Sequence, residues 1–359
     1  MNIKELLDMT IVIPTKNRPQ YVERILTYYL GLDFIGNIII IDSSDEETAE
    51  YIKKYVNNIN KVNFTYSFSE GLPTTVIRDN VNLIKTKYVS FLGDDDYIIP
   101  TGILRSIEYL KNNPDIVACR GEALKIRDSN LSSDSISRYW NFFNRLEDSS
   151  GDRVIKHFSD YHTPFFHVCR SEMFIKAYSN APSMSEIEAG YDRLIGDELI
   201  VAALMLAYGK FASIEGLHLV RTNSIEAKER RVTMLDDANI LGKEMAGRDL
   251  IKKTATAVSE QDAITFEEAE KIAISILDKP ILTQKYNSTI NESFKGFLKP
   301  ILQFLNLFEL CLTLRSNFYI TKRKVFTLLF VSKNKRIGLK NLLNPSAAAK
   351  CRNKRDSSD

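Results

Sequence analysis

The stretch Tyr88-Val-Ser-Phe-Leu-Gly-Asp-Asp-Asp-Tyr-Ile-Ile-Pro100 decides how this chain is interpreted. Its apolar beginning, residues 88–92, is typical of a buried strand, and three consecutive acids follow. Pro100 suits the first turn of a helix, which the apolar spacing continues to Leu110. Ligands of open α/β sheets bind just beyond the carboxyl ends of strands, where oxygen ligands suit Mg²⁺ or Mn²⁺. The alternative is an acidic turn that caps the next helix.

Strands and helices alternate on both sides of this stretch. The predicted strands are apolar on both faces, which is typical of strands covered by helices in an α/β layer. They cover residues 10–15, 37–42, 62–66, 88–92, 116–120, 162–170 and 210–221, with helices predicted over 74–85 and 199–208 among others, and a polar loop over 127–150. We therefore predict an α/β fold with a mostly parallel central sheet flanked by helices.

Length and composition predict a soluble globular protein of two or three units. The chain has 359 residues, of which 44% are hydrophobic and 26% charged. These values are ordinary for globular domains. We predict an α/β domain over residues 1–225, a helical C-terminal region over 226–345, and a disordered basic tail over 346–359.

Charge is distributed unevenly along the chain. From Arg315 onward there are 12 Lys and Arg against two acids, a local +10, whereas the residues before it sum to −8. The apolar run 297–314 precedes this basic end. We expect either peripheral attachment to an anionic membrane surface or a buried C-terminal helix, and no nucleic acid partner.

Cysteines and hydropathy predict a cytoplasmic location. Four cysteines lie far apart without metal-ligand spacing, at Cys119, Cys169, Cys311 and Cys351. They are interpreted as reduced thiols. The sequence predicts neither a signal peptide nor a transmembrane helix, so attachment would be to the inner face of the cell membrane.

Five short motifs, taken in order, resemble the family 2 glycosyltransferases of the GT-A fold. They are IPTKNRP at 13–19, IDSS at 41–44, IRDN at 77–80, FLGDDDYIIP at 91–100 and GDE at 196–198. The resemblance covers about residues 8–225. It implies a nucleotide-diphospho-sugar donor, a divalent cation (Mn²⁺ or Mg²⁺) and inverting transfer to an acceptor hydroxyl.

The resemblance also assigns roles by position. The donor-binding residues are Pro14, Thr15, Asn17, Arg18 and Asp42 for the nucleoside, Arg78 for the phosphates or ribose, and Asp94 for the ribose. Asp95 is the expected metal ligand, with Asp96 in support. Many relatives carry an acid where Gly93 stands, so the assignment within the acidic triplet stays open.

The catalytic base is expected in the pair Asp197-Glu198. The family usually has Glu-Asp, and here the order is reversed. Residue type favours Asp197 and spacing to Gly209 favours Glu198, so both remain candidates. The alternative for both is an ordinary acidic first helical turn.

The predicted function is metal-dependent, inverting sugar transfer in the synthesis of a surface glycan or polysaccharide, with a glycan or lipid-linked acceptor. One alternative is a sugar nucleotidylyltransferase, although the loop at 14–19 lacks the glycines that such an enzyme needs. A hydride-transferring enzyme is disfavoured because no GxGxxG motif follows the first strand. A catalytically inactive sugar-binding or scaffold protein is the alternative outside enzymes.

Overall fold

The computed structural model of the protein describes residues 2–59, 63–126, 136–140, 144–186, 191–222, 240–279 and 281–282. Nine strands form one sheet in the order β3-β2-β1-β4-β8-β6-β9-β5, with β7 paired to β6. The strands are β1 (Met9–Thr15), β2 (Asn37–Asp42), β3 (Phe64–Phe68), β4 (Tyr88–Phe91), β5 (Tyr97–Ile98), β6 (Ile116–Ile126), β7 (Ile136–Trp140), β8 (Val168–Arg170) and β9 (Lys210–Thr222).

The sheet is parallel in its N-terminal half and mixed beyond it. Strands β3, β2, β1 and β4 pair in parallel, so their carboxyl ends meet at one edge. Strand β8 runs antiparallel to β4 and β6, and β6 is parallel to β9. The predicted α/β fold is confirmed, and the antiparallel pairs lie on the side of the sheet away from β3.

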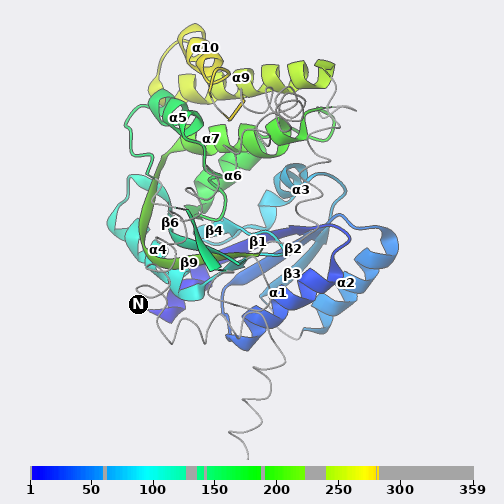
Figure 1. Ribbon diagram of the computed structural model, residues 1–359. Coiled ribbons are helices and arrows are strands. Elements are labelled where there is room, and N and C mark those ends of the chain that lie inside the picture. Colours follow the sequence, from blue (N-terminus) through cyan, green and yellow to red (C-terminus); the bar gives the residue numbers. More distant parts are fainter. Residues whose placement is uncertain are drawn as a thin grey trace, which may run out of the picture.

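Alternating side chains divide the core into two layers, because successive residues of a strand point to opposite faces. Ile11 and Ile13 of β1 face the layer of α1 (Pro19–Gly31), α2 (Glu46–Asn58) and α4 (Pro100–Asn112). Val12 faces the opposite layer. That layer holds α3 (Pro73–Asn80), α5 (Ser150–Ser159), α6 (Ser171–Ser179) and α7 (Ile200–Tyr208) (Figure 1).

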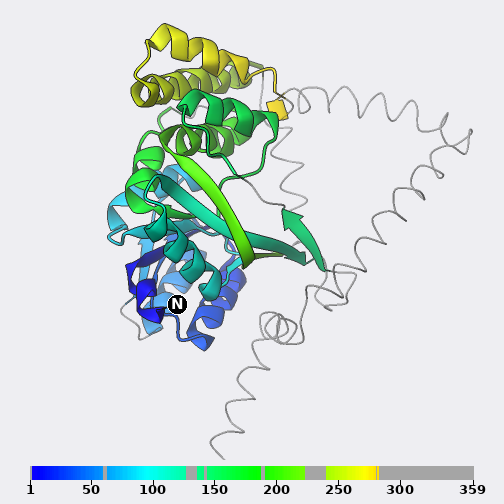
Figure 2. The ribbon, with the colours of Figure 1, turned by 90° about the vertical axis from the view of Figure 1, so that its left-hand side faces the viewer.

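Two C-terminal helices, α9 (Ile240–Asp262) and α10 (Phe266–Ser275), pack on this second layer. Both views place them beyond α5 and α7, on the side away from the sheet (Figure 2). Asp262 at the end of α9 accepts from the backbone N–H groups of Ser150 and Gly151 at 2.7 and 2.9 Å, so it caps the N-terminus of α5. Both helices lie within the predicted helical region 226–345, most of which is outside the described residues.

Several predicted bounds need correction. The helix predicted over 74–85 ends at Asn80 and continues as a 3-10 turn, Val81–Leu83. Only Val168–Arg170 of the predicted strand 162–170 is extended, since Phe166 adopts a left-handed φ of 69°. The polar run 127–150, predicted as loop, contains strand β7.

Parts of the predicted C-terminal organisation lie outside the described residues. These include the apolar run 297–314 and the basic tail 346–359. Among the helices that are described, none is both long and apolar enough to cross a membrane. The membrane expectation therefore stays a prediction.

Candidate active site

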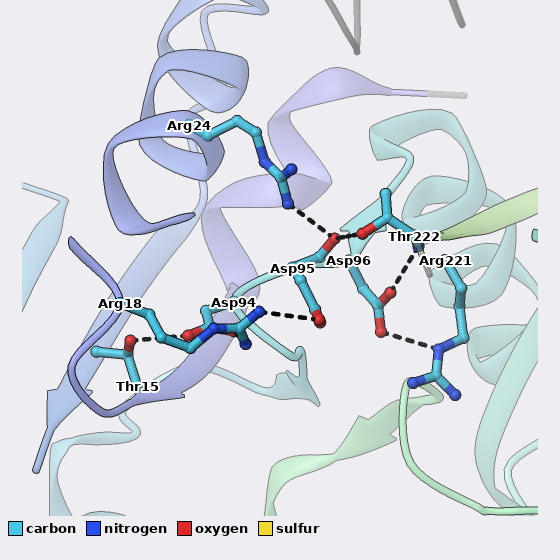
Figure 3. A network of polar contacts seen from close by, with 8 residues as sticks. All are labelled: Thr15, Arg18, Arg24, Asp94, Asp95, Asp96, Arg221 and Thr222. Carbon is cyan, nitrogen blue, oxygen red and sulfur yellow. Dashed lines mark hydrogen bonds and ion pairs between the residues drawn. The ribbon is translucent and has the colours of Figure 1, made fainter. Parts of the chain in front are cut away.

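The acidic triplet lies directly after β4, at the edge where the parallel strands end (Figure 3). Asp94 is 5% exposed. Its Oδ2 accepts from the Thr15 hydroxyl at 2.8 Å, and its Oδ1 forms an ion pair with Arg18. Thr15 ends β1 and Arg18 precedes α1, so two neighbouring strand ends meet in this contact. The structure thus brings the first loop and the acidic triplet into direct contact.

Asp95 is the most accessible member of the triplet, with 14% of its side chain exposed. Its Oδ2 accepts from Arg18 at 3.2 Å, while Oδ1 accepts no hydrogen bond from the described residues. Its backbone carbonyl accepts from Arg24 at 3.1 Å and from the Thr222 hydroxyl at 2.6 Å. The backbone of Asp95 is thus held from two sides, and one carboxylate oxygen remains available.

Asp96 points into the protein and is 1% exposed. Arg221 donates to its Oδ2 at 2.9 Å, and the backbone N–H of Thr222 donates to its Oδ1 at 3.1 Å. Burial raises the pKa of Asp96 to about 7, and the nearby Arg221 opposes this rise. Each oxygen of Asp96 accepts one hydrogen bond from the end of β9, so Asp96 fixes the position of the acidic triplet, and its predicted supporting role beside the metal stays a prediction.

The loop at 14–18 is bound to the loop that follows β2. Asn17 has a left-handed φ of 53°, which asparagine tolerates. Its backbone N–H donates to the Ser44 hydroxyl at 2.7 Å, and its side-chain oxygen accepts from the N–H of Asp45 at 2.9 Å. Pro14 and Thr15 pair with the last two residues of β2. The predicted nucleoside residues therefore gather at one edge.

Asp42 is fully buried at this edge. One oxygen accepts from the N–H of Ser44 at 2.9 Å and from its hydroxyl, and the other accepts from the Tyr66 hydroxyl at 3.0 Å. Asp45, not Asp42, caps the next helix, by accepting from Thr48. Asp42 shapes the loop, and its contact with a nucleoside stays a prediction.

Asp197 and Glu198 lie in a π-helical turn, Ile195–Leu199, which precedes α7. π-Helical turns are rare in proteins overall, but those that occur are often located at functional sites. Thr74 donates to Asp197 twice, from its N–H to Oδ1 at 3.3 Å and from its hydroxyl to the backbone carbonyl at 2.7 Å. Oδ2 of Asp197 is buried and has no hydrogen-bond partner among the described residues.

The two acids of the pair have different surroundings. Burial raises the pKa of Asp197 to about 7, although Thr74 opposes the rise. Glu198 instead accepts a hydrogen bond from the Tyr161 hydroxyl at 2.8 Å. Thr74 lies in the first turn of α3, a helix that begins five residues after β3 at the carboxyl edge of the sheet. Asp197 is therefore brought to the same edge as the acidic triplet.

Arg78 lies in the second turn of α3 and forms an ion pair with Glu186 at 3.4 Å. This is the surface-pair arrangement that is ordinary for a helical arginine. Its role toward donor phosphates stays a prediction. His167 is buried, and its Nδ1 lies 2.7 Å from the carbonyl oxygen of Pro164.

Four residues that hold these acids were not predicted from the sequence. They are Arg24, Arg221, Thr222 and Thr74, which reach Asp95, Asp96 and Asp197. Arg221 and Thr222 end β9, so the strand-end rule, applied to the last predicted strand, would have found them. No sequence motif identifies Arg24 or Thr74 as site residues. They share only a position near the start of a helix that follows a strand.

The residues at this edge fit a cation held mainly by the substrate. Across the described part of the chain, no three His, Cys, Asp or Glu side chains are grouped as a preformed metal site. Asp95 offers one free oxygen at the edge. Mg²⁺-type cations in phosphate chemistry are often held by one or two carboxylates together with substrate phosphates. Asp95 suits that arrangement.

The α/β sheet with acids at its parallel strand ends is the GT-A class of fold. Residues 10–176 match the family model described as glycosyl transferase family 2. This segment contains the first-loop residues, Asp42, Arg78 and the acidic triplet. Residues 10–176 of the chain thus form a segment that matches the family 2 glycosyltransferases.

Solved structures show limited likeness. S. aureus TarS residues 1–349 in complex with UDP-GlcNAc align with a TM-score of 0.43 and 11% identity, over 78% of this chain and 92% of that one. A mannosyltransferase, PcManGT from Pyrobaculum calidifontis, in complex with GDP-Man and Mn²⁺ gives 0.42 and 12%, over 90% and 87%. The chain spans about half, 53%, of the longer S. aureus TarS structure. At these scores the likenesses add nothing to the family match, and no curated protein matches the sequence.

Proposed function

We propose that this chain transfers a sugar, with inversion, from a nucleotide-diphospho-sugar to an acceptor hydroxyl, and that Asp197 is the general base. The observation that carries this choice is the Oδ2 of Asp197, which is buried and unpartnered among the described residues. A buried polar atom without a partner invites a ligand donor. An acceptor hydroxyl supplies such a donor, and among the buried oxygens of the pair only Asp197 Oδ2 lacks a partner within the described residues.

The proposed chemistry is a single displacement. Asp197 takes the proton of the acceptor hydroxyl, and that oxygen forms a bond with the anomeric carbon of the donor. The bond from this carbon to the diphosphate oxygen breaks, and the nucleoside diphosphate leaves with the electron pair. One attack from the opposite face inverts the anomeric centre. General-base help of this kind is worth about 10²–10⁴ in rate.

The donor is proposed to bind at the edge formed by the first loop and the acidic triplet. Arg18 and Arg24 bring two guanidinium groups to this edge, which suits phosphate recognition. Asp95 would hold a Mn²⁺ or Mg²⁺ ion against the donor diphosphate. When bound, such an ion neutralises negative charge on the leaving diphosphate.

We also propose a glycan or lipid-linked acceptor and a role in surface polysaccharide synthesis at the inner face of the membrane. The support is the family match and the local charge of +10 after Arg315. A chain shortened to residues 1–295 should lose binding to anionic lipid vesicles that the full chain shows. Equal binding by both chains would remove this part of the proposal.

The central test separates donor binding from transfer. A panel of UDP-, GDP- and dTDP-sugars is screened for thermal stabilisation that depends on Mn²⁺, since a ligand of the folded state raises Tm. Asp197→Asn should keep the stabilisation and lose transfer, measured as release of the nucleoside diphosphate. Glu198→Gln is the matched control, because its amide oxygen still accepts from Tyr161. Full transfer by Asp197→Asn would exclude the proposed base.

A further inference from the structure

Tyr191 contacts both helix α9 and the turn that carries Asp197. Tyr191 is 4% exposed, and its hydroxyl donates to Asp249 of α9 at 2.8 Å. Its ring lies against Gly196: a Cβ added to this glycine would be 2.8 Å from the Tyr191 Cε1. Only glycine therefore leaves room for the ring beside the backbone immediately before Asp197.

One helical turn after Asp249, a second residue of α9 contacts a neighbouring segment. Lys253 forms an ion pair with Glu186 at 3.0 Å, and Glu186 also contacts Arg78 of α3. Positions four apart lie on one face of a helix, so Asp249 and Lys253 point toward the same neighbours. Leu250, between them, is fully buried in the core layer that also contains α7. Helix α9 is thus a well-anchored support.

The turn that receives this support has a geometry that depends on its surroundings. The N–H of Ile200 donates to the carbonyl of Ile195, five residues earlier, which defines the π-helical turn. Reversion to α-helical bonding shifts the register by one residue, and each residue of a helix corresponds to a rotation of about 100°. Such a shift would turn Asp197 away from Thr74.

We propose that Asp249 and Tyr191 are positioning residues for transfer: they hold the π-helical turn in the register that presents Asp197. The inference rests on the proposed role of Asp197 as the base. It makes a C-terminal helix, beyond the segment that matches the family model, part of the catalytic apparatus. Asp249 orients the tyrosine, the tyrosine ring supports Gly196, and Gly196 precedes the base.

The test uses the full chain and separates catalysis from stability. Tyr191→Phe removes the hydroxyl and keeps the ring, and Asp249→Ala removes the acceptor. Each should lower kcat by about 10-fold to 100-fold, as expected for a base displaced by a fraction of an ångström to 1 Å. KM for the donor and the donor-induced rise in Tm should stay at wild-type values. Asp249→Asn should restore most of kcat, because its amide oxygen still accepts from Tyr191.

A matched control lies at the other end of the same helix. Asp262→Ala removes the cap of α5 and should lower Tm without changing kcat. The proposal is overturned if Tyr191→Phe and Asp249→Ala lower only Tm as this control does, or if Asp249→Asn is as impaired as Asp249→Ala. If Asp249→Ala does not fold, the kcat of Tyr191→Phe decides alone.

Failure of this inference is distinguishable from failure of the proposed function. An inactive Asp197→Asn together with a fully active Tyr191→Phe overturns only the positioning role. An active Asp197→Asn overturns the base, and with it the reason for supporting this turn.

Discussion

Replacing Asp197 by asparagine should make the stability of the protein less dependent on pH. Burial raises the pKa of this carboxyl from an ordinary 3.8 to about 7. Between these values the folded chain holds the proton and the unfolded chain releases it, so stability falls as pH rises from about 4 to about 7. From pH 5 to pH 7 the loss covers two pH units at about 1.4 kcal/mol each, or about 3 kcal/mol. Asparagine does not titrate, so the variant lacks this loss.

The measurement is the free energy of unfolding in urea at pH 5 and pH 8, for the wild type and Asp197→Asn. The difference, variant minus wild type, should rise by about 3 kcal/mol between the two pH values. The pKa of Asp96 is also raised to about 7, but Asp96 titrates in both chains and cancels in the difference. Asp79→Asn, an exposed change on α3, is the control and should follow the wild type. A difference that is equal at pH 5 and pH 8 would refute the burial argument.

Three further predictions concern the same site and its support. Because the proposed base acts only when ionised and the pKa of Asp197 is raised to about 7, kcat/KM should increase about tenfold per pH unit below 7 and level off above it, and a flat profile from pH 5 to 8 would contradict this. Asp95→Asn should abolish the Mn²⁺-dependent part of donor stabilisation in a thermal shift assay, and an unchanged shift would exclude Asp95 as the ligand. Arg18→Ala should lower the free energy of unfolding by about 3 kcal/mol, because it leaves Asp94 buried without its ion pair; urea unfolding measures this, and a loss below 1 kcal/mol, roughly the value of a surface pair, would contradict it.

The strand ends were predictable because they depend on local sequence. Apolar runs that stop at Thr15, Asp42 and the acidic triplet identify both the strands and the edge at which their side chains meet. The helices that begin with Pro19 and Pro100 follow the same local logic, since proline suits the first turn of a helix. Parallel pairing then brings these ends together without further information.

The internal neutralisation of the triplet was not predictable from local sequence. Three carboxylates in a row suggested that an external cation is needed, whereas Arg18 pairs with Asp94 and Arg221 pairs with Asp96. Arg221 is separated from Asp96 by 125 positions. Its position depends on β9 pairing with β5, next to the triplet, a contact between distant parts of the chain. Of the three acids, only Asp95 has a carboxylate oxygen that accepts no hydrogen bond from the described residues.

The choice between Asp197 and Glu198 shows most clearly where sequence reasoning ends. Adjacent residues share their composition, their helix and their place in the motif, so no local pattern separates them. Their surroundings differ: Thr74, 123 positions away, donates to one oxygen of Asp197 and the other is buried without a partner among the described residues, whereas Tyr161 donates to one oxygen of Glu198. A general base is most effective when its pKa lies near the operating pH. Burial raises the pKa of Asp197 to about 7, and this burial depends on contacts made by helices far apart in the sequence.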